Sequence, residues 1–361
     1  MSGYLSAFPQ SEFAATESFY PKGPWVPYYV MHKLLVGLLE AHSLLGLRLA
    51  LTVALKLSEH LRGRVEKMLA SGGEQRWEEF INQEVGGMSE ALTQLAVATK
   101  DPSWVSLAKR FERPCFVGPL ALVGASNKRG AAQAIEKMHA NTHLPEILGA
   151  AARYEATGEP AAARAAMSFF DELNASHTFA TGGSTSGETW LGARQLGGPV
   201  AQQHAENYWS HDHHETCVSH NSMRTSRSIM AWGAGADAGG AAAKVLSHAE
   251  YFERTLLNAV LGTQRGTTPG SMLYMLPMGS GVSKAGISNA PQGHHWSDGE
   301  HHFWCCQGSG IEAFARIHDS VFWRLSPAFA ARGGGGAEHV FILQHMSSEL
   351  VWSDLGVRLT P

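Results

Sequence analysis

The feature that most constrains the fold is a helical pair that occurs twice in the first half of the chain. The first copy is "MSEALTQLAVATKDPSWVSLAKRF" and the second is "PEILGAAARYEATGEPAAARAAMSFF". In each copy, apolar residues recur at three- and four-residue steps on both sides of a turn that contains Pro102 or Pro160. An acidic residue precedes each proline, which can open a helix because the first turn does not need its missing N–H. Such recurring pairs predict an α-solenoid or a closed ring of helical hairpins, and we favour an α/α toroid.

Further helices and a β segment are expected around these pairs. "HKLLVGLLEAHSLLG" and "ALTVALKLSEHLRGRVEKML" come before them, and "HNSMRTSRSIMAW" and "KVLSHAEYFERTLLNAVLG" come after. Residues 331–337 are glycine-rich and are interpreted as a linker, whereas "HVFILQHMSSELVW" beyond them is rich in strand formers. A lone hairpin is not stable by itself, so these strands are expected to belong to a β domain. The predicted organisation is a helical domain over 1–330, the linker, and the beginning of an incomplete β domain over 338–361.

The composition excludes several classes of function. The 361 residues are 44% hydrophobic and 17% charged, which is typical of a globular protein with a sizeable core. A formal net charge of −4 gives no reason to expect nucleic acid or an anionic membrane as a partner. The sequence has no run of about 18 apolar residues that could span a bilayer, and its first residues lack the pattern of a signal peptide. Four cysteines are too few for a disulfide scaffold, so metal binding, catalysis or core packing is expected of them.

Two adjacent cysteines, Cys305 and Cys306 in "FWCCQG", are the clearest candidates for chemistry. A disulfide between neighbours would close a strained ring. "HHETCVSH" adds Glu215 and Cys217, and one carboxylate with three thiols is a plausible tetrahedral set for zinc. The alternative is that Cys217 and one of the adjacent pair are buried free thiols. Cys115 has no acidic or cysteine neighbour at ligand spacing and is expected to pack in the core.

Histidines crowd both cysteine motifs. They are His211, His213 and His214 before Cys217, and His294, His295, His301 and His302 before Cys305. Imidazole is a common zinc ligand, so these side chains offer an alternative set of ligands. We expect them instead to form polar loops near the site, because three thiols and Glu215 already fill four positions. One of them could still orient a ligand through a hydrogen bond.

Two further segments contain candidate site residues. Glu188 follows the Gly/Ser/Thr-rich run "TGGSTSG", from which a carboxylate can project into a cavity where desolvation raises its pKa towards that of a general acid. A solvated loop glutamate is the alternative. In "HANTHLP", His139 and His143 are four residues apart and would share one face of a helix. Packing or substrate contact is expected of them rather than metal binding, because the chain has no HExxH motif.

Together these motifs resemble the family once labelled DUF1680 and now glycoside hydrolase family 127 (GH127), the β-L-arabinofuranosidases, and most closely its plant-type branch. The matching segments run in family order from residue 3 to about residue 325. They include "GYLSAFP", "EVGGMSEAL", "HANTHLP", "ATGGSTSGETW", "ETCVSHNSMRTSR" and "FWCCQGSGIEAFARIHDSVFW". The resemblance implies an (α/α)6 barrel followed by β-sandwich domains, and secretion or a cell-wall location. In the family, "GYLSAFP" lies well inside the barrel, so this chain is expected to be truncated at both ends and to expose apolar helix faces.

The resemblance also implies an activity and roles for single residues. The expected enzyme is a retaining exo-glycosidase that releases terminal β-L-arabinofuranosyl or similar groups from cell-wall glycans or glycoproteins. On the matching motifs, Cys305 would be the nucleophile and Glu188 the acid/base, while His139 and Tyr274 would contact the sugar by a looser alignment. The zinc ligands would be Glu215, Cys217, Cys305 and Cys306.

Two other functions stay open on the sequence. In a zinc hydrolase of another type, the metal would activate water directly, which needs an open coordination position that four protein ligands would deny. A helical carbohydrate-binding protein, or a degenerate family member with structural zinc, would keep the ligands without catalysis.

Overall fold

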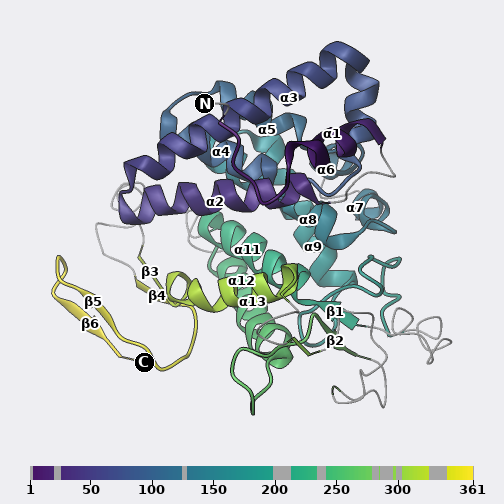
Figure 1. Ribbon diagram of the computed structural model, residues 1–361. Helices are drawn as coiled ribbons and strands as arrows, with labels where there is room; N and C mark the ends of the chain where they lie inside the picture. Colours follow the sequence, from purple (N-terminus) through teal and green to yellow (C-terminus); the bar gives the residue numbers. More distant parts are fainter. Residues whose placement is uncertain are drawn as a thin grey trace. The chain divides into compact units, whose positions relative to one another are not determined.

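The computed structural model describes residues 3–19, 26–123, 128–197, 213–233, 241–278, 284, 296–297, 303–324 and 340–360. Their contacts divide the chain into two units, Met1–Glu172 and Leu173–Pro361. The described residues are mainly helical with a few strands of three residues each, as Figure 1 shows, which confirms the predicted fold class. None of the described helices is both long and apolar enough to cross a membrane. The predicted linker 331–337 lies outside the described residues, and the predicted domain boundaries beside it stay a prediction.

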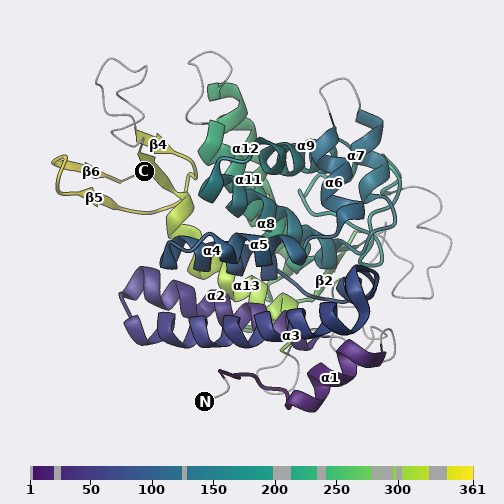
Figure 2. The same cartoon turned by 90° about the horizontal axis from the view of Figure 1, so that it is seen from above.

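The first unit contains the helices α1 to α8 and most of α9. Their bounds are α1 Gln10–Phe19, α2 Pro27–Leu45, α3 Arg48–Ile81, α4 Met88–Thr99, α5 Ser103–Arg110, α6 Pro114–Leu122, α7 Lys128–Ile135, α8 Ala140–Thr157 and α9 Pro160–Ser176. The helices predicted from "HKLLVGLLEAHSLLG" and "ALTVALKLSEHLRGRVEKML" are α2 and α3, which lie side by side in Figures 1 and 2. The periodicity of the apolar residues therefore located these elements correctly.

The two predicted helical pairs are α4–α5 and α8–α9, and both turn through a left-handed residue. This residue is Lys100 at φ 57° after α4 and Gly158 at φ 72° after α8. Glycine adopts this conformation readily, whereas a lysine there is uncommon. Glu159 in the second turn forms ion pairs with Lys109 of α5 and Arg153 of α8, both at 2.9 Å. The acidic residue before the second proline therefore links the two pairs.

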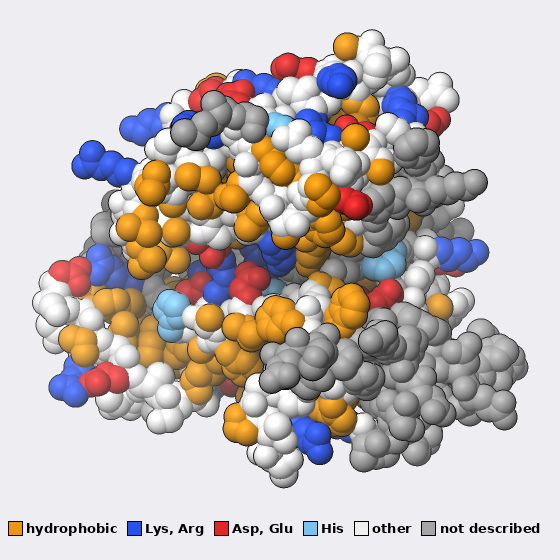
Figure 3. All heavy atoms as spheres, viewed as in Figure 1, with side chains coloured by type: hydrophobic (Ala, Val, Ile, Leu, Met, Phe, Trp, Pro, Cys, Tyr) orange, Lys and Arg blue, Asp and Glu red, His pale blue; other side chains and the backbone are white. Residues whose placement is uncertain are grey.

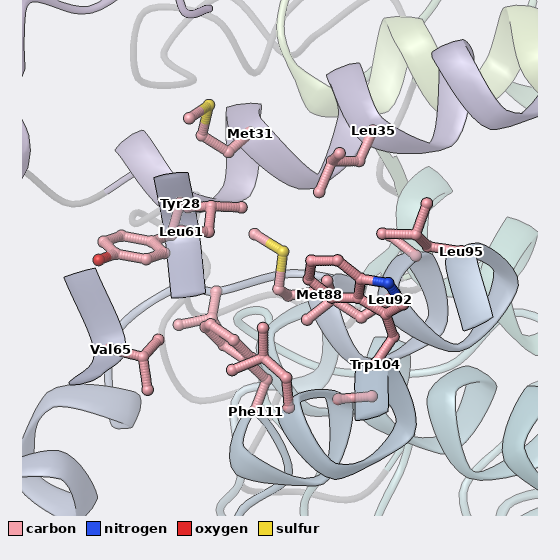
Figure 4. Close-up of a cluster of buried hydrophobic side chains, with 14 of the residues drawn as sticks. Tyr28, Met31, Leu35, Leu61, Val65, Met88, Leu92, Leu95, Trp104 and Phe111 are labelled. Carbon is pink, nitrogen blue, oxygen red and sulfur yellow. The ribbon is translucent and has the colours of Figure 1, made fainter. Parts of the chain in front are cut away.

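The core of the first unit is formed by the apolar faces of α2, α3, α4 and α5. Figure 4 shows Leu35 of α2, Leu61 of α3 and Leu92 of α4 in one cluster with Trp104 and Phe111. All five side chains are buried. Burying one such apolar side chain stabilises the fold by about 1.5–3 kcal/mol, so this cluster holds the helices against one another.

Leucines are exposed where α2 connects to α3. The exposed fractions are 78% for Leu44, 71% for Leu45, 50% for Leu47 and 75% for Leu49. Gly46 lies between them at φ 69° and ends α2 in the left-handed conformation. Figure 3 shows hydrophobic side chains gathered over α2 on the visible face. The first unit therefore presents an exposed apolar surface at this connection, while the predicted truncation stays a prediction.

The second unit combines helices with two-stranded sheets. Its elements are β1 His213–Glu215, α11 Thr216–Gly233, α12 Ala241–Thr255, the π-helical η2 Leu256–Val260, the 3-10 helix η3 Leu261–Thr263, β2 Met275–Pro277, α13 Cys305–Ala315, η5 Ile317–Ser320, β3 Phe322–Arg324, β4 Val340–Ile342, β5 Leu350–Trp352 and β6 Val357–Leu359. Antiparallel pairs form between β1 and β2, β3 and β4, and β5 and β6. The strands predicted from "HVFILQHMSSELVW" are β4 and β5. Helix α11 contacts both α12 and α13, which brings the two cysteine motifs together.

Candidate metal centre

Glu215 and Cys217 lie at the junction of β1 and α11. Glu215 ends β1 and is paired with Met275 of β2. Thr216 opens α11, and both its backbone N–H and its hydroxyl donate to the backbone oxygen of Tyr274 at 3.1 Å. These bonds fix the first turn of α11 against β2, and Cys217 belongs to that turn. The Glu215 and Cys217 side chains are both fully buried.

Cys305 and Cys306 are the first two residues of α13. The backbone N–H of Trp304, just before the helix, donates to Oε1 of Gln307 at 2.8 Å. The buried Gln307 side chain therefore satisfies a donor at the helix start and fixes the turn that carries both sulfurs. Cys306 is buried, whereas Cys305 is partly exposed, and both are free thiols.

The structure brings together all four residues that the sequence predicts as metal ligands. The ligand atoms of Glu215, Cys217, Cys305 and Cys306 lie within 4.8 Å of one another. Cys306 Sγ is 3.2 Å from Cys217 Sγ and 3.5 Å from Glu215 Oε1. Oε2 of Glu215 is buried and has no hydrogen-bond partner among the described residues. The cluster could hold a metal ion, since a cation would satisfy this oxygen and a thiolate-rich set with one carboxylate fits zinc.

The electrostatics of the cluster also favour a cation. Burial, together with the charges of Glu188 and Cys305, raises the pKa of Glu215 well above its usual value. Burial likewise raises the pKa values of Cys217 and Cys306. Hydrogen bonds with Cys217 and Cys306 hold the pKa of Cys305 well below its usual value. Four acidic groups in a buried cluster cannot all ionise without a counter-charge, which a divalent cation would provide.

Two further predicted site residues, Tyr274 and Glu188, border the cluster. The phenol oxygen of Tyr274 lies 3.1 Å from Cys305 Sγ. Burial and the charge of Glu215 raise the pKa of Tyr274, so the phenol keeps its proton and can donate it to the sulfur. Glu188 lies in a turn between the bridged residues Ser186 and Thr189, and its charge acts on both Glu215 and Cys305. Glu188 has a left-handed backbone at φ 59°, an uncommon conformation for a residue with a side chain.

Sequence reasoning missed the contact that His213 makes with this turn. His213 is buried in β1, and its Nε2 accepts a hydrogen bond from the Gly187 N–H at 3.2 Å. Residues alternate between the two faces of a strand, so His213 is on the same face as Glu215. Strand periodicity was thus the signal that could have identified it.

The remaining histidines near the cysteine motifs have other positions. Neither His213 nor His214 belongs to the ligand cluster. His214 is buried against Gly183: a Cβ added to Gly183 would lie 2.3 Å from Cγ of His214. The other histidines of the two motifs lie outside the described residues: His211, His294, His295, His301 and His302.

His139, His143 and Cys115 lie in the first unit. Nδ1 of His139, which caps α8, accepts a hydrogen bond from the Thr142 N–H at 3.2 Å. Nδ1 of His143 is 2.8 Å from the backbone oxygen of His139. A sugar contact by His139 stays a prediction. Cys115 is exposed, so the prediction that it packs in the core is wrong, because the neighbouring Phe116 takes the buried position on α6.

A family profile described as "Beta-L-arabinofuranosidase, GH127 catalytic domain" matches residues 1–319 of the chain. The chain therefore belongs to glycoside hydrolase family 127. No curated protein matches it in a sequence search. The resemblance that the sequence motifs indicated is thus confirmed at the level of the family, while membership of the plant-type branch stays a prediction.

Solved GH127 structures show the same fold. A GH127 beta-L-arabinofuranosidase from Geobacillus stearothermophilus T6 is 14% identical to this GH127 chain, with a TM-score of 0.60 over 97% of this chain and 52% of that chain. The structure of another GH127 beta-arabinofuranosidase is 18% identical, with a TM-score of 0.50 over 82% of this chain and 42% of that chain. The GH127 chain therefore spans about half the length of these two proteins or less.

Proposed function

We propose that this GH127 chain is a zinc-dependent retaining glycoside hydrolase that releases terminal β-L-arabinofuranosyl or similar groups from cell-wall glycans or glycoproteins. One observation carries the proposal: the buried cluster of one carboxylate and three thiols has Tyr274 and Glu188 at its border. The printed names of both solved relatives describe beta-arabinofuranosidases, which supports this class of sugar.

The residues proposed to hold the metal are Glu215, Cys217, Cys305 and Cys306. Zinc, when bound, would keep the thiols deprotonated and offset part of their combined negative charge. A free thiol has a pKa of about 8.5 and is mostly protonated at neutral pH, so an attacking sulfur needs such activation.

Cys305 is the proposed nucleophile because it is the one cysteine of the cluster that is partly exposed. Its sulfur would attack the anomeric carbon of the terminal sugar while Glu188 gives a proton to the departing glycosidic oxygen. The bond from the anomeric carbon to that oxygen breaks, and the sugar becomes covalently attached to Cys305. The phenol of Tyr274, 3.1 Å from the sulfur, would orient Cys305 by its hydrogen bond.

The second step would release the sugar. Glu188, now deprotonated, would take a proton from a water molecule whose oxygen attacks the anomeric carbon. The carbon–sulfur bond breaks and the electron pair returns to Cys305. Two successive displacements at one carbon retain its configuration.

The decisive test compares Cys305→Ser with Glu188→Gln on p-nitrophenyl β-L-arabinofuranoside. Glu188→Gln is expected to lower kcat by roughly 100- to 10,000-fold, the usual contribution of general acid–base catalysis. Cys305→Ser is expected to abolish turnover, and Cys115→Ser, which changes an exposed cysteine in the first unit, serves as the matched control. Full turnover by Cys305→Ser, or an inverted product in a proton NMR time course, would exclude this mechanism.

A second candidate function is a carbohydrate-binding protein with structural zinc. The observation that favours it is the set of four protein ligands, since structural zinc sites are closed in this way. About one zinc per chain without hydrolysis of any furanoside would support it.

A further inference from the structure

Each of the three cluster sulfurs lies within hydrogen-bond distance of a donor group that is not one of the four ligand side chains. The Tyr274 phenol lies 3.1 Å from Cys305 Sγ, and the backbone N–H of Cys217 donates to Cys306 Sγ at 3.4 Å. The hydroxyl of Ser309 donates to Cys217 Sγ at 3.1 Å. Neither the metal set nor the proposed mechanism uses Ser309.

The contact of Ser309 crosses between two helices. Ser309 lies on α13, one turn after Cys305, and Cys217 lies on α11. A serine inside a helix commonly donates to the backbone oxygen four residues earlier. A hydroxyl has one proton to donate, and here Ser309 directs it to the Cys217 sulfur instead. The serine is 2% exposed, so water does not compete freely for this bond.

The negative charge of the cluster gives the hydrogen bond from Ser309 to the Cys217 sulfur a stabilising role. One carboxylate and three thiolates carry four negative charges, so a divalent cation leaves the buried centre with an excess of negative charge. Donors to the sulfurs stabilise that excess, and hydrogen bonds to ionised groups are stronger than those between neutral groups. Residues that hold a ligand from outside the coordination sphere also orient it towards the metal.

We propose that Ser309 is a positioning residue of the metal centre: its hydroxyl orients the Cys217 sulfur, stabilises the negative charge on it and thereby sets the affinity for zinc. The inference rests on the proposed metal site but not on glycosidase activity. Cys217 and Cys306 are the two fully buried thiols of the site. Ser309 therefore acts on a fully buried ligand of the ion, not on Cys305, the ligand that is also the proposed nucleophile.

The test measures metal binding by the full chain, with Ser309→Ala, Ser309→Thr and a control at Ser320. Zinc affinity is measured by competition with a chromophoric chelator, and the cobalt(II)–thiolate charge-transfer band reports the sulfur ligands. Ser309→Ala is expected to weaken zinc binding roughly 10- to 100-fold and to shift the cobalt band. Ser309→Thr keeps the hydroxyl and is expected to bind like the parent. Ser320→Ala changes another buried serine of the second unit, which donates to Asp319 at 2.7 Å, and is expected to leave zinc affinity unchanged.

Each outcome decides a different claim. Parent-like zinc affinity and an unshifted cobalt band in Ser309→Ala would overturn the role of Ser309 while the metal site stands. Loss of affinity in Ser309→Thr as large as in Ser309→Ala would also overturn it, because the hydroxyl is retained. No binding of zinc or cobalt by the folded parent would instead overturn the metal site and, with it, the proposed function. If far-UV circular dichroism shows that the alanine variant is unfolded, Ser309→Val supplies the comparison, because valine matches the shape of the threonine variant without its hydroxyl.

Discussion

Replacing Glu146 by glutamine is expected to destabilise the first unit strongly, because Glu146 is the buried counter-charge of Arg113. Glu146 on α8 is 0% exposed and Arg113 is 2% exposed. The Arg113 guanidinium forms an ion pair with Glu146 Oε1, and the Arg113 backbone N–H donates to Oε2 at 2.7 Å. Both carboxylate oxygens are thus engaged by one residue.

The loss in the free energy of unfolding can be estimated from the Arg113 charge that Glu146→Gln leaves in the core. Arginine keeps its charge at any accessible pH, so Glu146→Gln leaves the buried Arg113 cation without its ion-pair partner. Removing one partner of a buried ion pair costs about 3–5 kcal/mol, a large share of a typical unfolding free energy of roughly 5–15 kcal/mol. Burial raises the pKa of Glu146 above its usual value, although the charge of Arg113 opposes this shift. We expect the carboxylate to be ionised, because the permanent charge of Arg113 is buried beside it.

Thermal and urea unfolding followed by circular dichroism would measure the loss. At about 2–4 °C per kcal/mol for a unit of this size, Tm should fall by roughly 6–20 °C. Glu74→Gln is the matched control, because Glu74 pairs with Arg110 in the same unit on an exposed surface, and no measurable change is expected. A loss of less than about 1 kcal/mol for Glu146→Gln would refute the reasoning, because it would mean that Glu146 is protonated in the folded state.

Two more predictions concern pH and packing in the first unit. Burial lowers the pKa of His143 to about 3, so the unfolded chain binds a proton below about pH 6.5 while the folded chain does not. Stability is therefore lost as pH falls from about 6.5 towards 3. In His143→Gln, the free energy of unfolding measured in urea should change with pH by up to about 1.4 kcal/mol per pH unit less than in the parent. An unchanged pH dependence would contradict the assignment. Gly149→Ala would place a Cβ 2.4 Å from Ser89 Oγ, between α8 and α4, and should cost about 1–3 kcal/mol in thermal unfolding. Gly37→Ala, in α2 with nothing within 4 Å of the added Cβ, should instead be neutral or stabilising, and equal losses in both variants would contradict the packing argument.

Much of the helical part of the fold could be predicted because its signal is local. An amphipathic helix repeats its apolar residues every three or four positions, and this pattern located α2, α3 and both helical pairs. The exposed Cys115 shows the limit of that signal. Its place beside the buried Phe116 depends on which side of α6 faces the core, and the sequence around it is apolar on all sides.

The candidate site was predicted as a set of residues, but not as an arrangement. The chemistry of thiols and a carboxylate indicated Glu215, Cys217, Cys305 and Cys306 as possible ligands, and the family motifs agreed. Whether these groups meet depends on how α11 packs against α13, since no local pattern relates residues so far apart in the sequence.

By itself, the sequence determined the helical class, the family and the identities of the groups that can bind a metal, because periodicity, motifs and side-chain chemistry are properties of short segments. Only the tertiary structure decided that Ser309 reaches the Cys217 sulfur and that His213 supports the turn of Glu188. Such contacts depend on the packing of distant elements to within a few tenths of an ångström, and a hydrogen bond forms or fails within that range.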